Sequence, residues 1–197
     1  MSQDVIKKVN TRLKFLYRKG KCLDLSSRRL LANSLILCVF DYACCSWFSG
    51  LSVKSQNMLQ VCQNKVMRFV LDLHPRTSLN STHFSNINWL PLRLRVSHLK
   101  LNHMYRIVNG VAPRYLTHST PSPNHSHFTR SSILSVFVPR FLTNYGIKTF
   151  KYTSCILWNS LPAKIKECSN LSIFKSAVKR YFYSKLREEE SSTFSYF

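Results

Sequence analysis

The sequence predicts a mainly α protein, a bundle of amphipathic helices with at most a short β-strand or hairpin around residues 133–150. Apolar residues make up 45% of the 197 residues and aromatic residues 13%, which is enough to build a buried core. Apolar residues recur at helical spacing along most of the chain, whereas a run with the β-branched content of a strand occurs at 133–139. The length fits one large domain or two small ones.

Residues 1–73 are predicted to form a segment of three helices. The first helix covers 3–19 and ends at Gly20, because glycine commonly stops a helix. It is amphipathic, since its apolar residues fall within a third of the helical wheel and its cations cover the opposite face. The apolar residues are Val5, Ile6, Val9, Leu13, Leu16 and Tyr17.

The second and third helices are predicted to supply the centre of this segment. The second begins at Ser26 or Ser27, either of which can cap it, and runs to about Phe48. Its second half is apolar nearly all the way round, so we expect it to be buried centrally. The third covers about 53–72. Its inward residues are expected to be Met58, Leu59, Cys62, Val66, Phe69 and Val70.

A linker at 74–90 and a basic, mainly helical domain at 91–190 are predicted to follow. The linker is expected because its first ten residues are polar and rich in turn formers. In the domain, a helix covers about 91–109. The segment 117–132 is rich in Pro, Ser and His, so we expect it to be an exposed loop.

The remainder of this domain is predicted to be helical. One helix covers about 148–160 and another about 171–187. Three glutamates follow at 188–190, where negative charge opposes the helix dipole, so this end should fray into a tail at 191–197. The structural anchors of the fold are expected to be Trp47, Trp89, Trp158 and Phe174.

The chain carries a large positive charge. Lys and Arg total 29 against 8 acidic residues, for a formal net charge of +21. Internal ion pairs cannot neutralise such a surplus, so a polyanionic partner is expected. RNA or DNA, bound without sequence preference, is the first choice, and an anionic membrane surface is a weaker second. We expect no membrane partner.

The cysteines and the N-terminal sequence predict an intracellular protein, nuclear or cytoplasmic rather than secreted. Seven cysteines at irregular spacing fit free thiols in a reducing compartment. The chain opens without the pattern of a secretory leader. The most apolar run, 30–40, is too short to span a bilayer, so no transmembrane segment is expected.

No catalytic residue, metal site or cofactor is expected. Nucleotidyl transfer through two metals needs clustered carboxylates, and no two aspartates here are closer than seventeen positions. Four glycines, at 20, 50, 110 and 146, are too sparse for a glycine-rich phosphate loop. No cysteine and histidine spacing typical of a zinc site occurs.

One stretch, CVFDYACCSWF at 38–48, leaves two interpretations open. Cys38, Asp41 and Cys45 would share one face of a continuous helix, as ligands of a metal do. The alternative is a buried helix that uses cysteine as a small core residue, with Phe40, Tyr42 and Trp47 as packing anchors. We favour the second, because a fourth ligand is lacking. Asp41 then has to lie at the edge of the core or pair with a cation. The candidate cations are Arg28, Arg29 and Arg68.

Exposed cations on helices are the candidate nucleic-acid-binding residues, since Lys and Arg contact phosphates. They are Lys7, Lys8, Arg12, Lys14, Arg18, Lys19, Arg93, Arg95, Lys100, Arg106, Lys175, Lys179 and Arg180. Tyrosines between basic positions could stack on bases, with packing in the core or at its rim as the alternative for each. These tyrosines are Tyr105, Tyr115, Tyr145 and Tyr152.

Two stretches give the chain a family resemblance. NWLPLRLRVSHLKLNHMYRIVNGVAPRYL at 88–116 and LWNSLPAKIKECSNLSIFKSAVKRYF at 157–182 resemble the C-terminal region of reverse transcriptases of non-LTR (LINE-type) retrotransposons. The stretch from Trp158 to Lys175 is the most specific part. Upstream, VNTRLKFLYR and LANSLILCVFDYACCSWFSGL resemble the thumb that follows the palm in those RNA-directed DNA polymerases.

The resemblance implies a thumb and the domain after it, which grip the template–primer backbone. The palm aspartates of the family have no counterpart in this sequence, so no catalytic residue can be carried over and no enzyme activity is expected. The chain would then be a catalytically silent fragment of a transposable-element polymerase. The alternative is a structural or interaction module, or a non-functional translated remnant. Its exposed apolar face would need a polymerase palm or a second copy to cover it.

Overall fold

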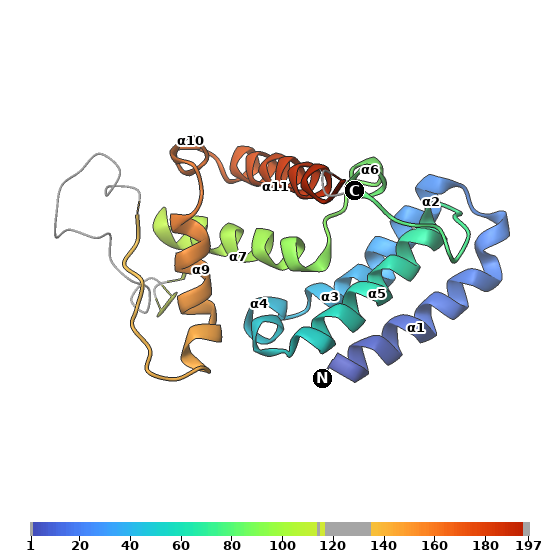
Figure 1. Ribbon diagram of the computed structural model, residues 1–197, viewed down its shortest axis with the longest axis horizontal. Coiled ribbons are helices and arrows are strands. Elements are labelled where there is room, and N and C mark those ends of the chain that lie inside the picture. Colours follow the sequence, from blue (N-terminus) through green and yellow to red (C-terminus); the bar gives the residue numbers. More distant parts are fainter. Residues whose placement is uncertain (1, 114, 117–134, 195–197) are drawn as a thin grey trace. The chain divides into compact units, whose positions relative to one another are not determined.

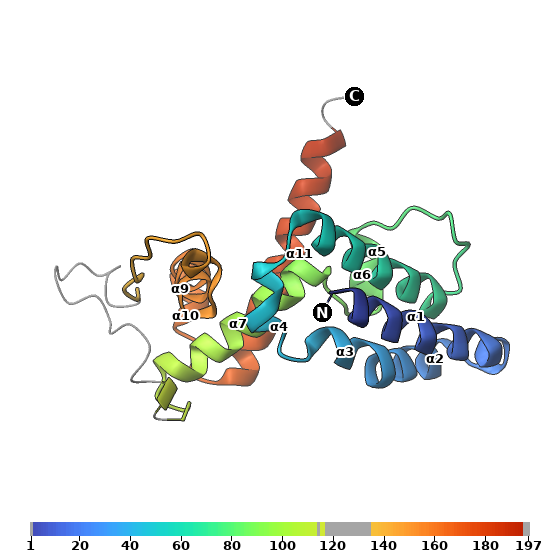
Figure 2. The ribbon, with the colours of Figure 1, turned by 90° about the horizontal axis from the view of Figure 1, so that it is seen from below.

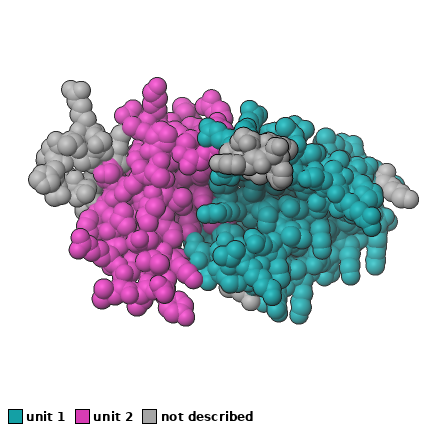
Figure 3. Space-filling model, viewed as in Figure 1, with its two compact units in different colours: residues 1–95, 186–197 teal, residues 96–185 magenta. Residues whose placement is uncertain are grey.

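The computed structural model describes residues 2–113, 115–116 and 135–194, and these are mainly helical (Figure 1). The prediction of a mainly α fold is confirmed. Within the described residues there is no β-strand, and Val136 alone makes a bridge. The predicted loop at 117–132 lies outside the described residues. The chain divides into two compact units (Figure 3), residues 1–95 with 186–197 and residues 96–185.

Unit 1 is built around two long helices. Helix α1 (Ser2–Lys19) packs against α5 (Val53–Val70) and against the chain that connects them (Figures 1 and 2). Of the six residues predicted to face inward on α1, Val9, Leu13 and Leu16 are buried and Val5 and Ile6 are half-buried. Tyr17 is a correction, because it is 52% exposed and packs only the edge of its ring on Phe69 of α5. On α5 the predicted inward residues are buried except Met58, which is 39% exposed.

The turn after α1 depends on glycine. Gly20 opens the short 3₁₀ helix η1 (Gly20–Cys22), and a Cβ at this position would lie 2.9 Å from the ring of Phe69 on α5. Glycine therefore lets the end of α1 approach α5 closely. The turn leads into α2 (Leu25–Leu31), which Asp24 caps by accepting a hydrogen bond from the Ser27 amide. Hydrogen bonds from Ser26 and Ser27 hold the pKa of Asp24 down at about 2.

The single helix predicted from Ser26 to Phe48 is wrong. The chain instead forms α2, the π-helical segment η2 (Ala32–Leu37), α3 (Cys38–Asp41), α4 (Cys44–Trp47) and the 3₁₀ helix η3 (Phe48–Gly50). The break falls at Ala43, whose φ of 48° is left-handed. The segment is also less buried than predicted, because the side chain of Tyr42 is 80% exposed rather than a packing anchor.

Much of the predicted linker at 74–90 is packed structure. It contains α6 (Ser81–Asn86), and Phe84, Ile87 and Trp89 are buried. The linker prediction failed because the polar residues of 74–83 include a helix N-cap. The Asn80 side chain accepts from the amide of His83, which satisfies a donor at the start of α6.

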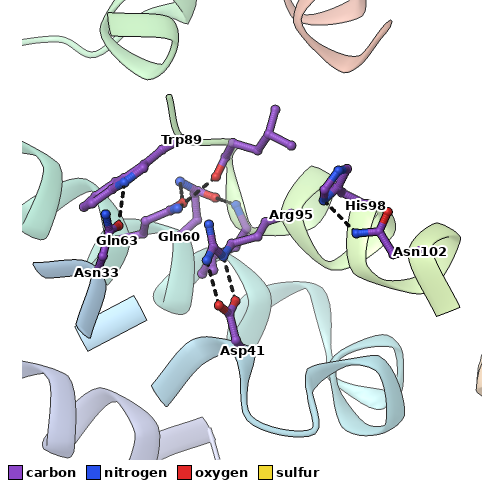
Figure 4. Close-up of polar contacts among 10 residues, drawn as sticks. Asn33, Asp41, Gln60, Gln63, Trp89, Arg95, His98 and Asn102 are labelled. Atoms are coloured by element: carbon purple, nitrogen blue, oxygen red, sulfur yellow. Dashed lines mark hydrogen bonds and ion pairs between the residues drawn. The ribbon is translucent and has the colours of Figure 1, made fainter. Parts of the chain in front are cut away.

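Side-chain amides hold the segment that leads into α7 (Leu92–Val108) against the helices of unit 1 (Figure 4). The buried Gln63 donates to the carbonyl of Leu90 at 2.9 Å, and Gln60 accepts from the amide of Leu92 at 2.8 Å. Trp89 donates its indole N–H to Asn33 at 2.9 Å. Asn33 lies in the π-helical segment, so that segment holds the indole of Trp89, which lies inside the predicted linker.

Asp41 forms a bidentate ion pair with Arg95, with both distances 2.6 Å (Figure 4). The expectation that Asp41 pairs with a cation is confirmed, but the partner is none of the three candidates. Arg28 pairs with Asp72 at 2.9 Å, and Arg68 donates to the carbonyl of Thr77. Charge-assisted, bidentate pairs are the strong kind of hydrogen bond.

We expect Asp41 and Arg95 to be coupled by about 1–3 kcal/mol in a double-mutant cycle with alanine, because both side chains are only 24–32% exposed. Urea unfolding measures the free energy of each variant. The pair Arg28–Asp72 is the control, since Asp72 is 81% exposed and its coupling should stay below about 1 kcal/mol. Equal coupling in the two cycles would contradict the expectation.

Unit 2 packs around aromatic side chains. It comprises most of α7, the 3₁₀ helix η4 (Gly146–Lys148), α9 (Phe150–Asn159), α10 (Ala163–Lys166) and the greater part of α11 (Leu171–Phe194). Trp158 and Phe174 are buried, with ring centroids 5.8 Å apart, and Tyr105 packs on Phe174 at 4.5 Å. Asn159 pairs its side-chain amide with both backbone groups of Val136, at 2.9 Å each. In residues 135–139, the described part of the predicted strand, only Val136 makes a bridge, and the side chain of Asn159 holds it.

The C-terminal part of α11 does not fray as predicted. The helix continues through the three glutamates to Phe194, so the predicted tail at 191–197 is wrong for its first four residues. The carboxylate of Glu190 accepts from the backbone amide and the hydroxyl of Ser81, both at 2.6 Å. The negative charge of Glu190 is attracted by the positive end of the α6 helix dipole. This attraction offsets the unfavourable position of Glu190 in its own helix.

Within the described part of the chain, no single helix is long and apolar enough to cross a bilayer. One bent pair, Leu25–Asp41 with Cys44–Gly50, meets the requirement by length and composition, and its two parts meet at 42°.

Candidate nucleic-acid interface

The exposed face of α1 carries all six of the cations predicted there. Its opposite face is held in the core of unit 1, so the helix presents its charges to solvent. Only one acid, Asp4, lies on the helix, in its first turn. The exposed cations are Lys7, Lys8, Arg12, Lys14, Arg18 and Lys19.

These cations form two rows along α1. Lys7, Lys14 and Arg18 lie opposite the buried stripe, at separations of seven and four residues, which correspond to about 10 and 6 Å along the axis. The second row is about a third of a turn away, because 100° separates successive residues of a helix. It consists of Lys8, Arg12 and Lys19.

Arg12 connects the second row to the rest of unit 1. Its guanidinium donates to the carbonyl of Leu35 in the π-helical segment and lies 3.8 Å from the sulfur of Cys38. Arg12 is thereby fixed in place, whereas the remaining cations of α1 extend from the surface.

Unit 2 has its own exposed cations. Arg106 of α7 and Arg180 of α11 are exposed, and Lys175 and Lys179 of α11 are half-buried. Arg93, at the start of α7 in unit 1, is exposed as well. Each unit thus has its own predicted basic residues, and the group on α1 is the denser one.

Two predicted phosphate contacts are corrected. Lys100 is 2% exposed and donates its ammonium to the hydroxyl of Thr153 at 2.6 Å, so it is a core residue of unit 2. Arg95 forms the ion pair with Asp41, so its guanidinium is already occupied by a carboxylate. Both lie on α7, where charged residues alternate with apolar ones, and helical spacing did not reveal which face would be covered.

The predicted stacking tyrosines differ in exposure. Tyr105 is buried and donates its hydroxyl to the carbonyl of Cys168 at 2.7 Å, which removes it as a base-stacking residue. Tyr115 and Tyr145 are 73% and 87% exposed. Tyr152 is half-buried and packs on Phe141 at 6.2 Å.

The cysteines do not gather into a site in the described residues. No group of three His, Cys, Asp or Glu side chains is placed to hold a metal there. Cys38 donates to the carbonyl of Ser34 at 2.9 Å, Asp41 is paired, and the break at Ala43 interrupts the helix face on which Cys45 was expected. Burial raises the pKa of the Cys62 and Cys155 thiols, which keeps them protonated.

A groove of about 630 Å³ lies between α1 and α5. Its floor is apolar, and Met58 and Val61 of α5 are 39% and 53% exposed there. Lys54 and Lys65 lie at its ends on α5, three helical turns apart. Sequence patterning missed this groove, because Met58 has the spacing of a core residue. The full lining is Ile6, Asn10, Lys54, Asn57, Met58, Val61, Cys62 and Lys65.

The resemblance to retrotransposon reverse transcriptases stays a prediction. It depends on the quoted stretches alone. Trp158 and Phe174, which lie in the most specific of them, are buried packing residues of unit 2. Comparison of the chain with protein-family profiles, with curated proteins and with solved structures finds no match.

Proposed function

We propose that this chain binds RNA or DNA through the phosphate backbone, without sequence preference and without catalysing a reaction. The observation that supports this most is the solvent-exposed cationic face of α1, with six cations and one acid on a helix whose other face is buried. Like charges this close repel one another, and a polyanion relieves that repulsion. The net charge of +21 favours the same class of partner.

The mechanism is charge neutralisation with release of counterions. Each phosphate that a Lys or Arg neutralises frees a condensed cation, so binding weakens as the salt concentration rises. Lys and Arg side chains on α1 reach phosphates without reading base edges, which explains the absence of sequence preference. The proposed origin is the C-terminal region of a non-LTR retrotransposon polymerase, in which this surface would face a template–primer duplex.

The salt dependence of binding tests the proposal. A labelled RNA hairpin titrated at several salt concentrations should give a plot of log K against log salt with a slope of about −4 to −5, if the six cations of α1 each contact a phosphate. A hairpin of different sequence and the same length serves as control and should bind equally. Absent binding, or binding that does not depend on salt, would refute the proposal.

A second function, that of an interaction module, is favoured by the groove between α1 and α5. A surface of exposed Met58 and Val61 between two lysines suits a partner with an apolar ridge and acidic flanks. Such a partner would cover apolar surface that otherwise promotes association. A polymerase palm or a second copy of the chain are the candidates that the resemblance suggests.

Light scattering coupled to size-exclusion chromatography tests this second function. If a second copy covers the groove, the chain should elute as a dimer, and Met58→Glu with Val61→Glu should convert it to a monomer. The control exchanges Val53, which is 73% exposed on α5 and does not line the groove, for Glu. A monomer at every concentration would exclude self-association.

A further inference from the structure

Phe15 is an exposed aromatic residue among the cations of α1. Phe15 is 59% exposed, whereas Val9, Leu13 and Leu16 of the same helix are buried. Tyr17 is also exposed, at 52%, but its ring already packs on Phe69 of α5 at 5.0 Å. Helix geometry places Arg12, Arg18 and Lys19 next to it, at i−3, i+3 and i+4. Phe15 therefore lies between the two rows of cations.

The surroundings of Phe15 limit what its ring can contact. A hydrophobic partner surface would have to bury Arg18 and Lys19, which form no ion pair within the described residues, and burying such charges is costly. An anionic membrane would need more apolar surface than one ring, and the apolar stripe of α1 is already covered by the core. A partner that combines regular negative charges with flat apolar faces can pair with the cations and also cover the ring of Phe15.

We propose that α1 binds single-stranded nucleic acid with an unpaired base stacked on the ring of Phe15 and the adjacent phosphates on Arg18 and Lys19. This inference rests on the proposed function and adds the class of ligand. In a duplex the base faces are covered by their neighbours, so a protruding ring has nothing to stack on, whereas a flexible single strand can turn a base outward. Arg12, tethered to the carbonyl of Leu35, fixes the place of one cation beside the ring.

The experiment compares the full chain with three variants. Phe15→Leu removes the ring and keeps an apolar side chain, and Phe15→Tyr keeps the ring. Tyr42→Leu is the matched control, because Tyr42 is 80% exposed in the same unit and does not lie on α1. The probes are fluorescein-labelled oligouridine, a blunt RNA duplex of equal length, and a single strand that carries one 2-aminopurine.

Phe15→Leu should weaken binding of the single strand by about five- to hundredfold, as expected for loss of one stacked base, and should leave duplex binding unchanged. The 2-aminopurine fluorescence should be quenched by the wild-type chain and by the Phe15→Tyr and Tyr42→Leu variants, but not by Phe15→Leu. Circular dichroism checks that all the variants retain their helical content.

Three outcomes would overturn the inference, and they are distinguishable. If the wild-type chain binds the oligouridine and the duplex and Phe15→Leu changes neither affinity, the ring does not stack and the proposed function stands. If the wild-type chain binds none of the three probes, the proposed function itself fails. If Phe15→Leu instead abolishes binding to phosphatidylserine vesicles or alters the oligomeric state, a membrane or a second copy covers the ring.

Discussion

Replacing Lys7, Lys14 and Arg18 with glutamine should weaken binding to single-stranded RNA about a hundredfold at 0.1 M salt. These three residues form the row of α1 that lies farthest from the core, so glutamine should leave the fold intact. Each phosphate contact contributes about 0.7–0.9 to the slope of log K against log salt, so losing three should flatten the slope by about 2–3. Fluorescence anisotropy titrations at several salt concentrations measure both quantities.

The matched control removes the same charge elsewhere in unit 1. Lys54, Lys65 and Arg76 are exposed and lie outside α1, and their replacement with glutamine also lowers the net charge by three. If position matters, this variant should retain most of the affinity and the slope. If the two triple variants lose affinity equally, binding follows the net charge alone, and α1 is not a binding face.

Replacing Trp158 with alanine should destabilise the protein by about 3–5 kcal/mol, because the indole is 1% exposed and its removal leaves a large cavity. Trp158 packs on Phe174, which is itself fully buried, so the cavity would open at the centre of unit 2. Urea unfolding monitored by circular dichroism measures the change in the free energy of unfolding.

Ile156 provides the control on the same helix. It lies two residues from Trp158 and is 43% exposed, so Ile156→Ala should cost about 1 kcal/mol or less. Both variants introduce alanine into the same helix, so the difference between their losses of stability reflects packing rather than helix propensity. A loss below about 1 kcal/mol for Trp158→Ala would mean that unit 2 does not depend on this aromatic core.

The long helices could be predicted from the sequence because each has an uninterrupted apolar stripe. For α1, the spacing of Val9, Leu13 and Leu16 identified both the buried stripe and the exposed cations. Burial against α5 then stabilised what the pattern favoured. The candidate interface on α1 was predictable for the same reason, since the exposed side of an amphipathic helix follows from its buried side.

The failures arise where tertiary contacts outweigh local pattern. No Gly or Pro marks the break at Ala43, and the apolar residues around it are equally compatible with one straight helix. Similarly, the partner of Asp41 lies 54 residues away, beyond the reach of any local rule. Glu190 is unfavourable at the C-terminal end of its own helix, and the group that stabilises it, the N-terminus of α6, lies 109 residues away.

Charged residues on α7 show a further limit of sequence patterns. Lys100 has an apolar stem and is buried in unit 2, where its ammonium donates to the hydroxyl of Thr153. The sequence does not reveal that Thr153 lies within hydrogen-bonding distance of Lys100. Phe15 is the opposite case, because its exposure contradicts residue type and thereby marks a position worth testing.

The π-helical segment Ala32–Leu37 also bears on how the chain can change length. A π-helical turn accommodates one residue more than an α-helical turn at the same rise, so the segment amounts to an insertion held inside a helix. Deleting a solvent-facing residue such as Ser34 would let the segment close into an α-helix. Phe40 and Asp41 would keep their orientation toward the core. In an ordinary helix, by contrast, deleting one residue rotates every later side chain by about 100°, so this segment can tolerate a deletion that an ordinary helix cannot.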